Sequence, residues 1–249
     1  MVFGSRAMDI VRDHGAVVVS PGYRLAWQAP HPAAFDDTAQ CGITRGPAWQ
    51  APHPAAFDDC WRAPPFLCDH ARELGVNGSQ IFAGGESAGG GLAAAVCMAA
   101  RGRGDVSVAF QAPLYPMLSN LDTASSAHNH GHVWNTWRNH LGWRLYLRKH
   151  AKDPRVSPYA SPSRQHDCAG LPAAYTFVGD GEPFYAETLE YVENLRRAGV
   201  RAEVDVYRCD VHAFDMLRPG WALSRRAIER FDEQVAYAVE HYEAEQPDA

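Results

Sequence analysis

The chain has 249 residues and a formal net charge of −6, from 23 basic and 29 acidic side chains. Nucleic-acid binding is not expected, because it depends on clustered Lys and Arg. The hydrophobic fraction of 46% supports a packed core and excludes a fully disordered chain. No apolar stretch reaches the roughly 20 residues that a membrane-spanning helix needs.

Helix and strand patterns alternate through the first hundred residues. A helix is predicted over 5–15, with Ser5 as a candidate N-cap, followed by a β-branched strand over 15–23. The short apolar segment 81–85 predicts a second strand that ends in glycines. The Ala-rich segment 87–100 then predicts a buried helix.

The segment AWQAPHPAAFDD occurs twice in this region, at 26–37 and again at 48–59, with a period of 22 residues. Two copies are too few for a solenoid, which needs about three stacked repeats. We expect one copy to occupy the native site and the other to loop out together with residues 38–47. Such an insertion is tolerated because loop-closure entropy grows slowly with length.

The same alternation continues through the second half of the chain. Strands are predicted at 106–116, 173–179 and 202–208, and helices at 182–199 and 224–244. The stretch 119–170 has weak periodicity and predicts a helical excursion between two strands. Alternating strands and helices favour an α/β fold with a mostly parallel central sheet flanked by helices, in a single domain over 1–249.

A G-x-S-x-G motif, Gly85-Glu86-Ser87-Ala88-Gly89, follows a predicted strand and opens a predicted helix. In that context a sharp turn presents the serine hydroxyl above the sheet edge. Small residues at 85 and 89 are expected to let the backbone approach closely, and the Ala88 N–H to face developing negative charge. The motif therefore predicts Ser87 as a nucleophile, against the alternative of a Gly-rich turn with an incidental serine.

A serine nucleophile needs a base and an acid that orients the base. His212 is the candidate base, because it alone among twelve histidines lies between the last predicted strand and the last predicted helix. The loop after strand 173–179 offers two candidate acids, Asp180 and Glu182, either of which could instead cap the following helix. The order serine, acid, histidine is typical of an α/β-hydrolase.

At this point the chain resembles a known family, the hormone-sensitive-lipase-like α/β-hydrolases, which include bacterial carboxylesterases. The matching segments occur in family order from the first residues to about residue 215: Tyr23-Arg24-Leu25-Ala26, HPAAFDDC (53–60), ELGVNGSQIFAGGESAGGGLAAA (73–95), QAPLYPML (111–118), VSPYASPS (156–163), GLPAAYTFVGDGEPF (170–184) and HAFD (212–215).

The resemblance implies a role for each matching residue. Ser87 becomes the nucleophile, His212 the base and Glu182 the acid, with Asp180 as the alternative acid. The Ala88 N–H becomes an oxyanion-hole donor, and Gly85, Glu86 and Gly89 form the nucleophile elbow.

Several positions depart from the family pattern. Glu182 stands where the family usually has Asp, Ala213 where it has Gly after the catalytic histidine, and Gly22 where it has Asp. The family also carries an HGGG segment whose N–H groups supply most of the oxyanion hole. This chain begins with Met-Val-Phe-Gly-Ser, which resembles the residues that follow HGGG. We therefore expect an N-terminally truncated α/β-hydrolase that lacks HGGG and the N-terminal cap, with reduced activity.

The resulting hypothesis is a serine carboxylesterase that hydrolyses short- to medium-chain acyl esters through a Ser-Glu/Asp-His triad. The alternatives are a catalytically impaired relative that binds a small molecule, and an inactive truncation. The expected partner is a small ester substrate, with no nucleic acid and no membrane span; a homodimer is compatible with this hypothesis.

No metal or organic cofactor is expected. His128, His130 and His132 have no carboxylate or Cys partner at a suitable spacing and are expected in a solvated loop. The six cysteines form no C-x-x-C pair, and charges interrupt the first 15 residues before a signal-peptide core can form. A cytoplasmic protein with reduced thiols is therefore expected.

Overall fold

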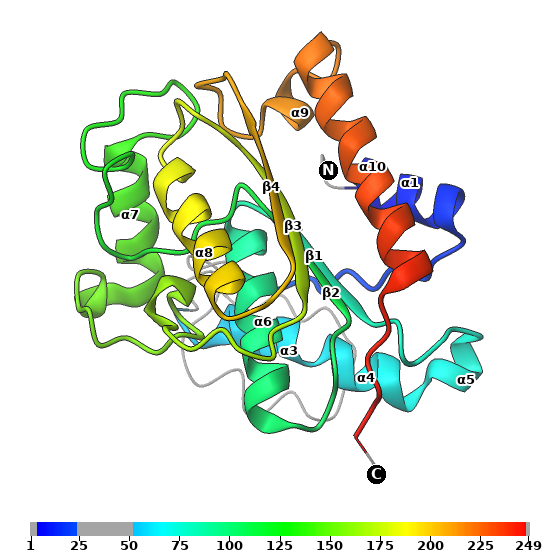
Figure 1. The fold of residues 1–249 in the computed structure, drawn as a ribbon. Helices are drawn as coiled ribbons and strands as arrows, with labels where there is room; N and C mark the ends of the chain where they lie inside the picture. Colours follow the sequence, from blue (N-terminus) through cyan, green and yellow to red (C-terminus); the bar gives the residue numbers. More distant parts are fainter. Residues whose placement is uncertain (1–3, 24–51, 248–249) are drawn as a thin grey trace.

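The computed structural model describes residues 4–23 and 52–247, and its centre is a parallel sheet (Figure 1). Its four strands lie in the order β1-β2-β3-β4, which is also their order in the chain, and every neighbouring pair is parallel. The predicted α/β fold with a parallel sheet is therefore confirmed. The strands are β1 (Phe82–Glu86), β2 (Phe110–Leu114), β3 (Ala173–Gly179) and β4 (Ala202–Tyr207).

Helices cover both faces of this sheet (Figure 1). The helices α1 (Gly4–His14) and α10 (Ala222–His241) lie together on one face. The opposite face carries α6 (Ala88–Arg103) and α8 (Tyr185–Arg197), and α3 (Ala55–Trp61) packs against α6. The remaining helical segments are α4 (Ala63–Asp69), α5 (Ala71–Leu74), α7 (Thr136–Leu147), α9 (Phe214–Leu217) and the 3-10 turns η1 (Arg148–His150) and η2 (Pro162–Arg164).

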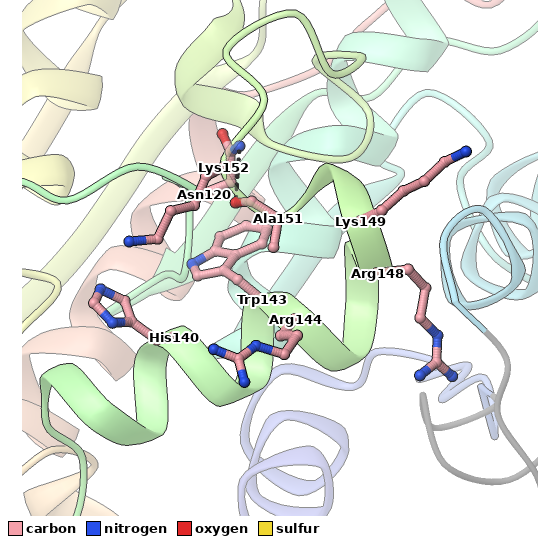
Figure 2. Close-up of a pocket in the computed structure, with 8 residues that line it drawn as sticks. All are labelled: Asn120, His140, Trp143, Arg144, Arg148, Lys149, Ala151 and Lys152. Atoms are coloured by element: carbon pink, nitrogen blue, oxygen red, sulfur yellow. Dashed lines mark hydrogen bonds between the residues drawn. The ribbon is translucent and has the colours of Figure 1, made fainter.

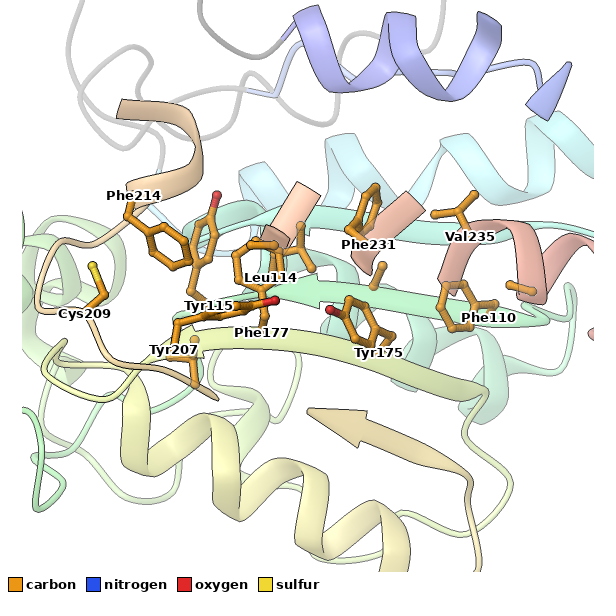
Figure 3. Packing of buried hydrophobic residues seen from close by; sticks show 14 residues of the cluster. Phe110, Leu114, Tyr115, Tyr175, Phe177, Tyr207, Cys209, Phe214, Phe231 and Val235 are labelled. Atoms are coloured by element: carbon orange, nitrogen blue, oxygen red, sulfur yellow. The ribbon is translucent and has the colours of Figure 1, made fainter. Parts of the chain in front are cut away.

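The largest core cluster fills the space between the sheet and α10 (Figure 3). Phe177 at the centre of β3 is fully buried and meets Tyr207 and Phe214 in edge-on ring contacts. From α10, Phe231 and Val235 pack down onto the same face. Burial of each large apolar side chain stabilises the fold by about 1.5–3 kcal/mol, so this cluster fixes the strand ends that carry the loops.

The helix α6 is buried on almost every side, as its Ala-rich sequence predicts. Its first turn lies against the loop that follows β2. A Cβ on Gly91 would overlap the carbonyl oxygen of Met117, whereas a Cβ on Gly89 would meet nothing within 4 Å. The close approach of α6 to the β2 loop therefore depends on Gly91.

Most predicted elements are confirmed, with ends that differ by a few residues. The strand predicted over 15–23 is wrong, because this segment pairs with no strand among the described residues, and Val17–Val19 are 37–43% exposed. A strand needs a ladder partner for its backbone groups. The first predicted helix begins at Gly4, so Ser5 lies inside the helix instead of capping it. The predicted excursion over 119–170 is confirmed by α7.

The first copy of the duplicated segment, at 26–37, and the residues 38–47 lie outside the described residues. Of the second copy, residues 52–59 are described, and they lead into α3 beside α6. Every helix in the described part of the chain is too short or too polar to span a lipid bilayer.

The two glycines in the first turn of α6 provide a matched test of this packing. Gly91→Ala should lower the free energy of unfolding by about 1–3 kcal/mol, because the new methyl group must displace the Met117 backbone. Gly89→Ala should leave it unchanged or raise it by up to about 1 kcal/mol, because Ala favours helix and the site is open. Urea unfolding of both variants measures the difference, and equal effects would contradict this account.

Candidate active site

Ser87 lies in the turn between β1 and α6, where the sequence predicted a nucleophile elbow. Ser87 has φ 56° and ψ −117°, a strained conformation that costs about 1–3 kcal/mol and persists only when neighbours hold it. Its N–H donates to the Leu114 carbonyl at 3.0 Å. Its carbonyl accepts from the N–H groups of Gly91 (3.1 Å) and Met117 (3.0 Å). These three bonds hold the Ser87 hydroxyl at the carboxyl end of the sheet.

Gly85 and Gly89 were both expected to allow this turn, but only at Gly85 would a side chain clash with the neighbouring backbone. A Cβ on Gly85 would lie 2.5 Å from the Gly89 carbonyl oxygen. A Cβ on Gly89 itself would point into open space, so the steric reason that we expected at Gly89 is wrong. The glycines Gly90 and Gly91 make the close contacts instead, and repeated small residues after the motif are the signal for them.

Ser87, His212 and Glu182 form a continuous hydrogen-bonded line. The Ser87 Oγ lies 2.8 Å from His212 Nε2, although 125 positions separate them in the chain. The opposite ring nitrogen, His212 Nδ1, donates to Glu182 Oε2. Because the carboxylate holds the proton on Nδ1, Nε2 is left free to accept the serine proton. His212 is 5% exposed and Glu182 is 1% exposed.

The alternative acid, Asp180, is placed differently. Its Oδ1 accepts a hydrogen bond from the Cys209 N–H at 3.0 Å, and its own N–H donates to the Tyr207 carbonyl at 2.9 Å. The Gly181 N–H also donates to the Cys209 carbonyl, at 3.0 Å. Asp180 therefore joins the loop after β3 to the loop after β4, and Glu182 is the carboxylate that contacts the histidine.

Aromatic rings surround the histidine. Tyr115 and Phe184 meet the His212 ring edge-on, with centroids 5.2 and 5.1 Å away, and Trp134 lies at 6.2 Å. Two other tryptophans of this region lie differently: Trp143 is buried, and Trp137 is 69% exposed. The contacts of Tyr115 and Phe184 fix the orientation of the His212 ring. The only sequence signals for these two residues were the position of Tyr115 after β2 and that of Phe184 near Glu182.

The Ala88 N–H lies in the first turn of α6, directly after Ser87. The first N–H groups of a helix have no acceptor within the helix, and they carry the positive end of its dipole. Within the described residues, no group of three or more His, Cys, Asp or Glu side chains could hold a metal ion.

A partly buried arginine, Arg6, links the loops that carry Ser87 and His212 to α1. Arg6 Nε donates to Glu86 Oε1 at 2.7 Å, and its Nη2 pairs with Asp215 Oδ2. Glu86 directly precedes Ser87, and Asp215 is three residues after His212. The Asp215 side chain is fully buried and the Arg6 side chain is 17% exposed, so solvent screens this pair weakly. Sequence analysis missed this contact because it joins residues 209 positions apart.

A second buried carboxylate supports the loop after β2. Glu187 in α8 accepts hydrogen bonds from the N–H groups of Leu118 (2.6 Å) and Ser119 (3.2 Å). Burial raises the pKa of Glu187 to about 8, although these two N–H groups act to lower it. Glu187 lies four residues before Tyr191 and therefore on the same buried face of α8. This spacing is the sequence signal that could have revealed the burial of Glu187.

Comparison with known proteins agrees with this geometry. Residues 47–216 match the sequence model of a family described by the alpha/beta hydrolase fold. Esterase LipI of Mycobacterium tuberculosis is 32% identical over 201 residues, which cover 80% of this chain and 56% of LipI. Ethyl acetate hydrolase of Pseudomonas putida is 24% identical over 93% of this chain and 64% of its own length. The chain thus spans less than two thirds of either relative.

Solved structures give the same result. A bacterial heroin esterase superimposes with a TM-score of 0.73 and 34% identity, over 76% of this chain and 61% of the esterase. An esterase of Pyrobaculum calidifontis superimposes with a TM-score of 0.77 and 28% identity, over 94% of this chain and 70% of the esterase. The resemblance found in the sequence is thereby confirmed at the level of fold and family.

The Arg6 contact predicts a large loss of stability when it is broken. Arg6→Met leaves the buried Asp215 carboxylate unpaired and should lower the free energy of unfolding by about 3–5 kcal/mol. Arg12→Met, on the same helix, removes an arginine whose side chain is 66% exposed and should change it very little. Urea unfolding compares the two variants, and similar losses in both would contradict a buried ion pair at Arg6.

The raised pKa of Glu187 predicts a defined dependence of stability on pH. Between the usual carboxyl pKa of 4.5 and the folded value of about 8, the folded chain keeps a proton that the unfolded chain has lost. The stabilisation that protonated Glu187 contributes to the folded chain is therefore fully present below pH 4.5 and declines as the pH rises toward 8. Glu187→Gln removes the ionisation, so its Tm relative to wild type should be higher at pH 8 than at pH 5.

Glu190→Gln is the matched control, because Glu190 lies on the same helix but is exposed. Each 1 kcal/mol of relative stabilisation at pH 8 corresponds to about 2–4 °C in Tm. Parallel Tm curves for wild type and Glu187→Gln from pH 5 to pH 8 would show that Glu187 does not titrate in this range.

Proposed function

Because this chain belongs to the alpha/beta hydrolase fold family, we propose that it is a serine carboxylesterase that hydrolyses esters of short- to medium-chain acids. The observation that carries the proposal is the line from Ser87 Oγ through the His212 ring to the Glu182 carboxylate, with its 2.8 Å contact between Ser87 and His212. The named esterase relatives support the same class of reaction.

In the proposed reaction, Ser87 Oγ attacks the ester carbonyl while His212 Nε2 takes its proton. Glu182 holds the imidazole in the required tautomer and stabilises its charged form. The Ala88 N–H donates to the oxyanion of the tetrahedral intermediate. His212 then protonates the departing alcohol, and a water molecule activated by the same histidine hydrolyses the acyl-Ser87 intermediate.

The proposal also assigns the neighbouring residues. Gly85 permits the elbow, Glu86 connects it to α1 through Arg6, and Gly89 lies in the first turn of α6, after its start at Ala88. Asp180 is assigned to loop fastening, because its carboxylate accepts from Cys209 instead of contacting His212.

A cytoplasmic location and self-association into a homodimer belong to the same proposal. The five cysteines described by the structure are all free thiols, as expected in a reducing compartment. Met8 and Val11 on α1 and Val17–Val19 after it are exposed apolar residues that a second copy would cover. Analytical ultracentrifugation measures this association directly.

The esterase activity is tested with p-nitrophenyl acetate, butyrate and octanoate. Wild type should hydrolyse at least one of them, and Ser87→Ala should reduce turnover to background. Glu182→Gln should lower kcat by about 10⁴-fold, because a neutral amide favours the wrong histidine tautomer. The series of acyl lengths then defines the acid that the pocket accepts.

Asp180→Asn provides the matched control. The asparagine Oδ1 can still accept from the Cys209 N–H, so activity should stay within about tenfold of wild type. Turnover that survives Ser87→Ala would exclude the proposed nucleophile. A folded wild type without activity toward any ester would favour a relative that only binds a small molecule.

A further inference from the structure

Two side chains from the segment before α7 bind the backbone on either side of Glu182. We call residues 123–129 of this segment the clamp loop. Ser125 Oγ in the clamp loop donates to the Pro183 carbonyl at 2.7 Å and accepts from the Ala186 N–H at 2.9 Å. Because Pro183 directly follows Glu182, this contact fixes the chain just after the carboxylate.

The second contact holds the chain just before Glu182. Asn129 Nδ2 donates to the Gly181 carbonyl at 2.9 Å, and Asn129 Oδ1 accepts from the Gly131 N–H, also at 2.9 Å. The bond from Gly131 orients the amide, because it requires the amide oxygen and leaves the nitrogen for Gly181. One loop therefore binds the residues on both sides of Glu182.

The Ser125 contact also supplies a cap that α8 lacks. The helix begins at Tyr185, and its N-cap residue, Phe184, makes no side-chain hydrogen bond to the first N–H groups. These N–H groups have no acceptor within the helix, and a serine hydroxyl is well suited to satisfy them. Ser125 does so for Ala186 from 61 positions away in the chain. Movement of the loop after β3 would break this cap.

The clamp loop is itself held firmly. Ser126 is fully buried, and its Oγ accepts from the Thr123 N–H at 2.8 Å. Thr136, the first residue of α7, donates through Oγ1 to the Ser126 carbonyl at 2.6 Å and accepts from the Asn129 N–H at 2.7 Å. The start of α7 thus fixes the part of the loop that carries Asn129.

The residues that lead into the clamp loop are anchored as well. Asp122 binds His140 Nε2 at 2.6 Å, and Asn120 Nδ2 donates to the Ala151 carbonyl at 3.3 Å. Figure 2 shows His140, Asn120 and Ala151 together around the hollow beside α7. The clamp loop therefore has a fixed base on α7 and on the turn that follows it.

A glutamate carboxylate is joined to its backbone by several rotatable bonds, so its contact with a histidine depends on where that backbone is held. We propose that Ser125 and Asn129 are positioning residues for Glu182. They hold the loop after β3 so that Glu182 Oε2 stays on His212 Nδ1. This role rests on the ester hydrolysis proposed above, and both residues act through Glu182 without touching the reacting atoms.

Asn129→Ala and Asn135→Ala form a matched pair of variants. Asn135 donates to the Gly131 carbonyl and accepts from the Arg138 N–H, both at 3.1 Å, but within the described part of the chain it makes no hydrogen bond to the loop after β3. Asn129→Ala should lower kcat for p-nitrophenyl esters by about tenfold and change KM by less than about twofold. Asn135→Ala should keep kcat within about twofold, and an equal loss in both variants would overturn the proposal.

Ser125→Ala, alone and combined with Glu182→Ala, separates positioning from a general structural role. Alone, it should lower kcat by about tenfold. In the Glu182→Ala background it should lower kcat further by no more than about twofold, because the carboxylate that Ser125 positions is gone. The proposal is overturned if Ser125→Ala keeps the wild-type kcat, or if it causes the same loss in both backgrounds.

The proton that His212 Nδ1 donates to Glu182 gives a readout that needs no substrate. Its hydrogen bond moves its NMR signal to low field, and the burial of both side chains slows its exchange with water. The signal should persist in Asn135→Ala and be shifted or lost in Ser125→Ala. Its absence from folded wild type, or an unchanged signal in Ser125→Ala, overturns the positioning role.

The two proposals therefore fail separately. If folded wild type hydrolyses no ester but Ser125→Ala still alters the His212 signal, the proposed function fails and the positioning of Glu182 stands. If wild type is active but the signal and kcat survive Ser125→Ala, the proposed function stands and the positioning role fails.

Discussion

The contact between Ser87 Oγ and His212 Nε2 at 2.8 Å constrains much of the fold, because it must join two loops from opposite edges of the sheet. Ser87 follows the edge strand β1, and His212 follows the other edge strand, β4. Parallel strands end at the same side of a sheet, so their loops can meet there. The twist of the sheet and the backbone bonds of the elbow then decide whether the two side chains come within hydrogen-bond distance.

Buried charge supports this alignment. Arg6 binds the residue before Ser87 and the residue three positions after His212, and Glu187 holds the loop that follows β2. A buried ion pair contributes little net stability compared with apolar packing, but breaking one partner is costly. Such contacts therefore act as fixed links. They restrain the loops that carry Ser87 and His212 at the positions that their 2.8 Å contact requires.

Local patterns were enough to predict most of the fold and the candidate site. The apolar runs at 173–179 and 202–208 became β3 and β4, and the motif at 85–89 became the turn into α6. The segment 15–23 has the same local pattern, yet it forms no strand, because a strand depends on a partner that the segment's own sequence does not reveal. The Arg6–Asp215 pair and the rings around His212 were missed for the same reason: both depend on three-dimensional contacts between distant residues.

Glu182 shows how a departure from the family pattern is accommodated. Glutamate is one methylene longer than the aspartate usual at this position, so its carboxylate would overreach a histidine placed for the shorter acid. Here Glu182 Oε1 turns back to accept the Gly179 N–H at 3.2 Å, at the end of β3, while Oε2 meets His212 Nδ1. Ala213, in the left-handed region at φ 56° and ψ 40°, places the histidine on its loop at a conformational cost that glycine would avoid. The longer acid therefore reaches the histidine by folding back along its own loop, and the strand end supplies the hydrogen bond that holds it there.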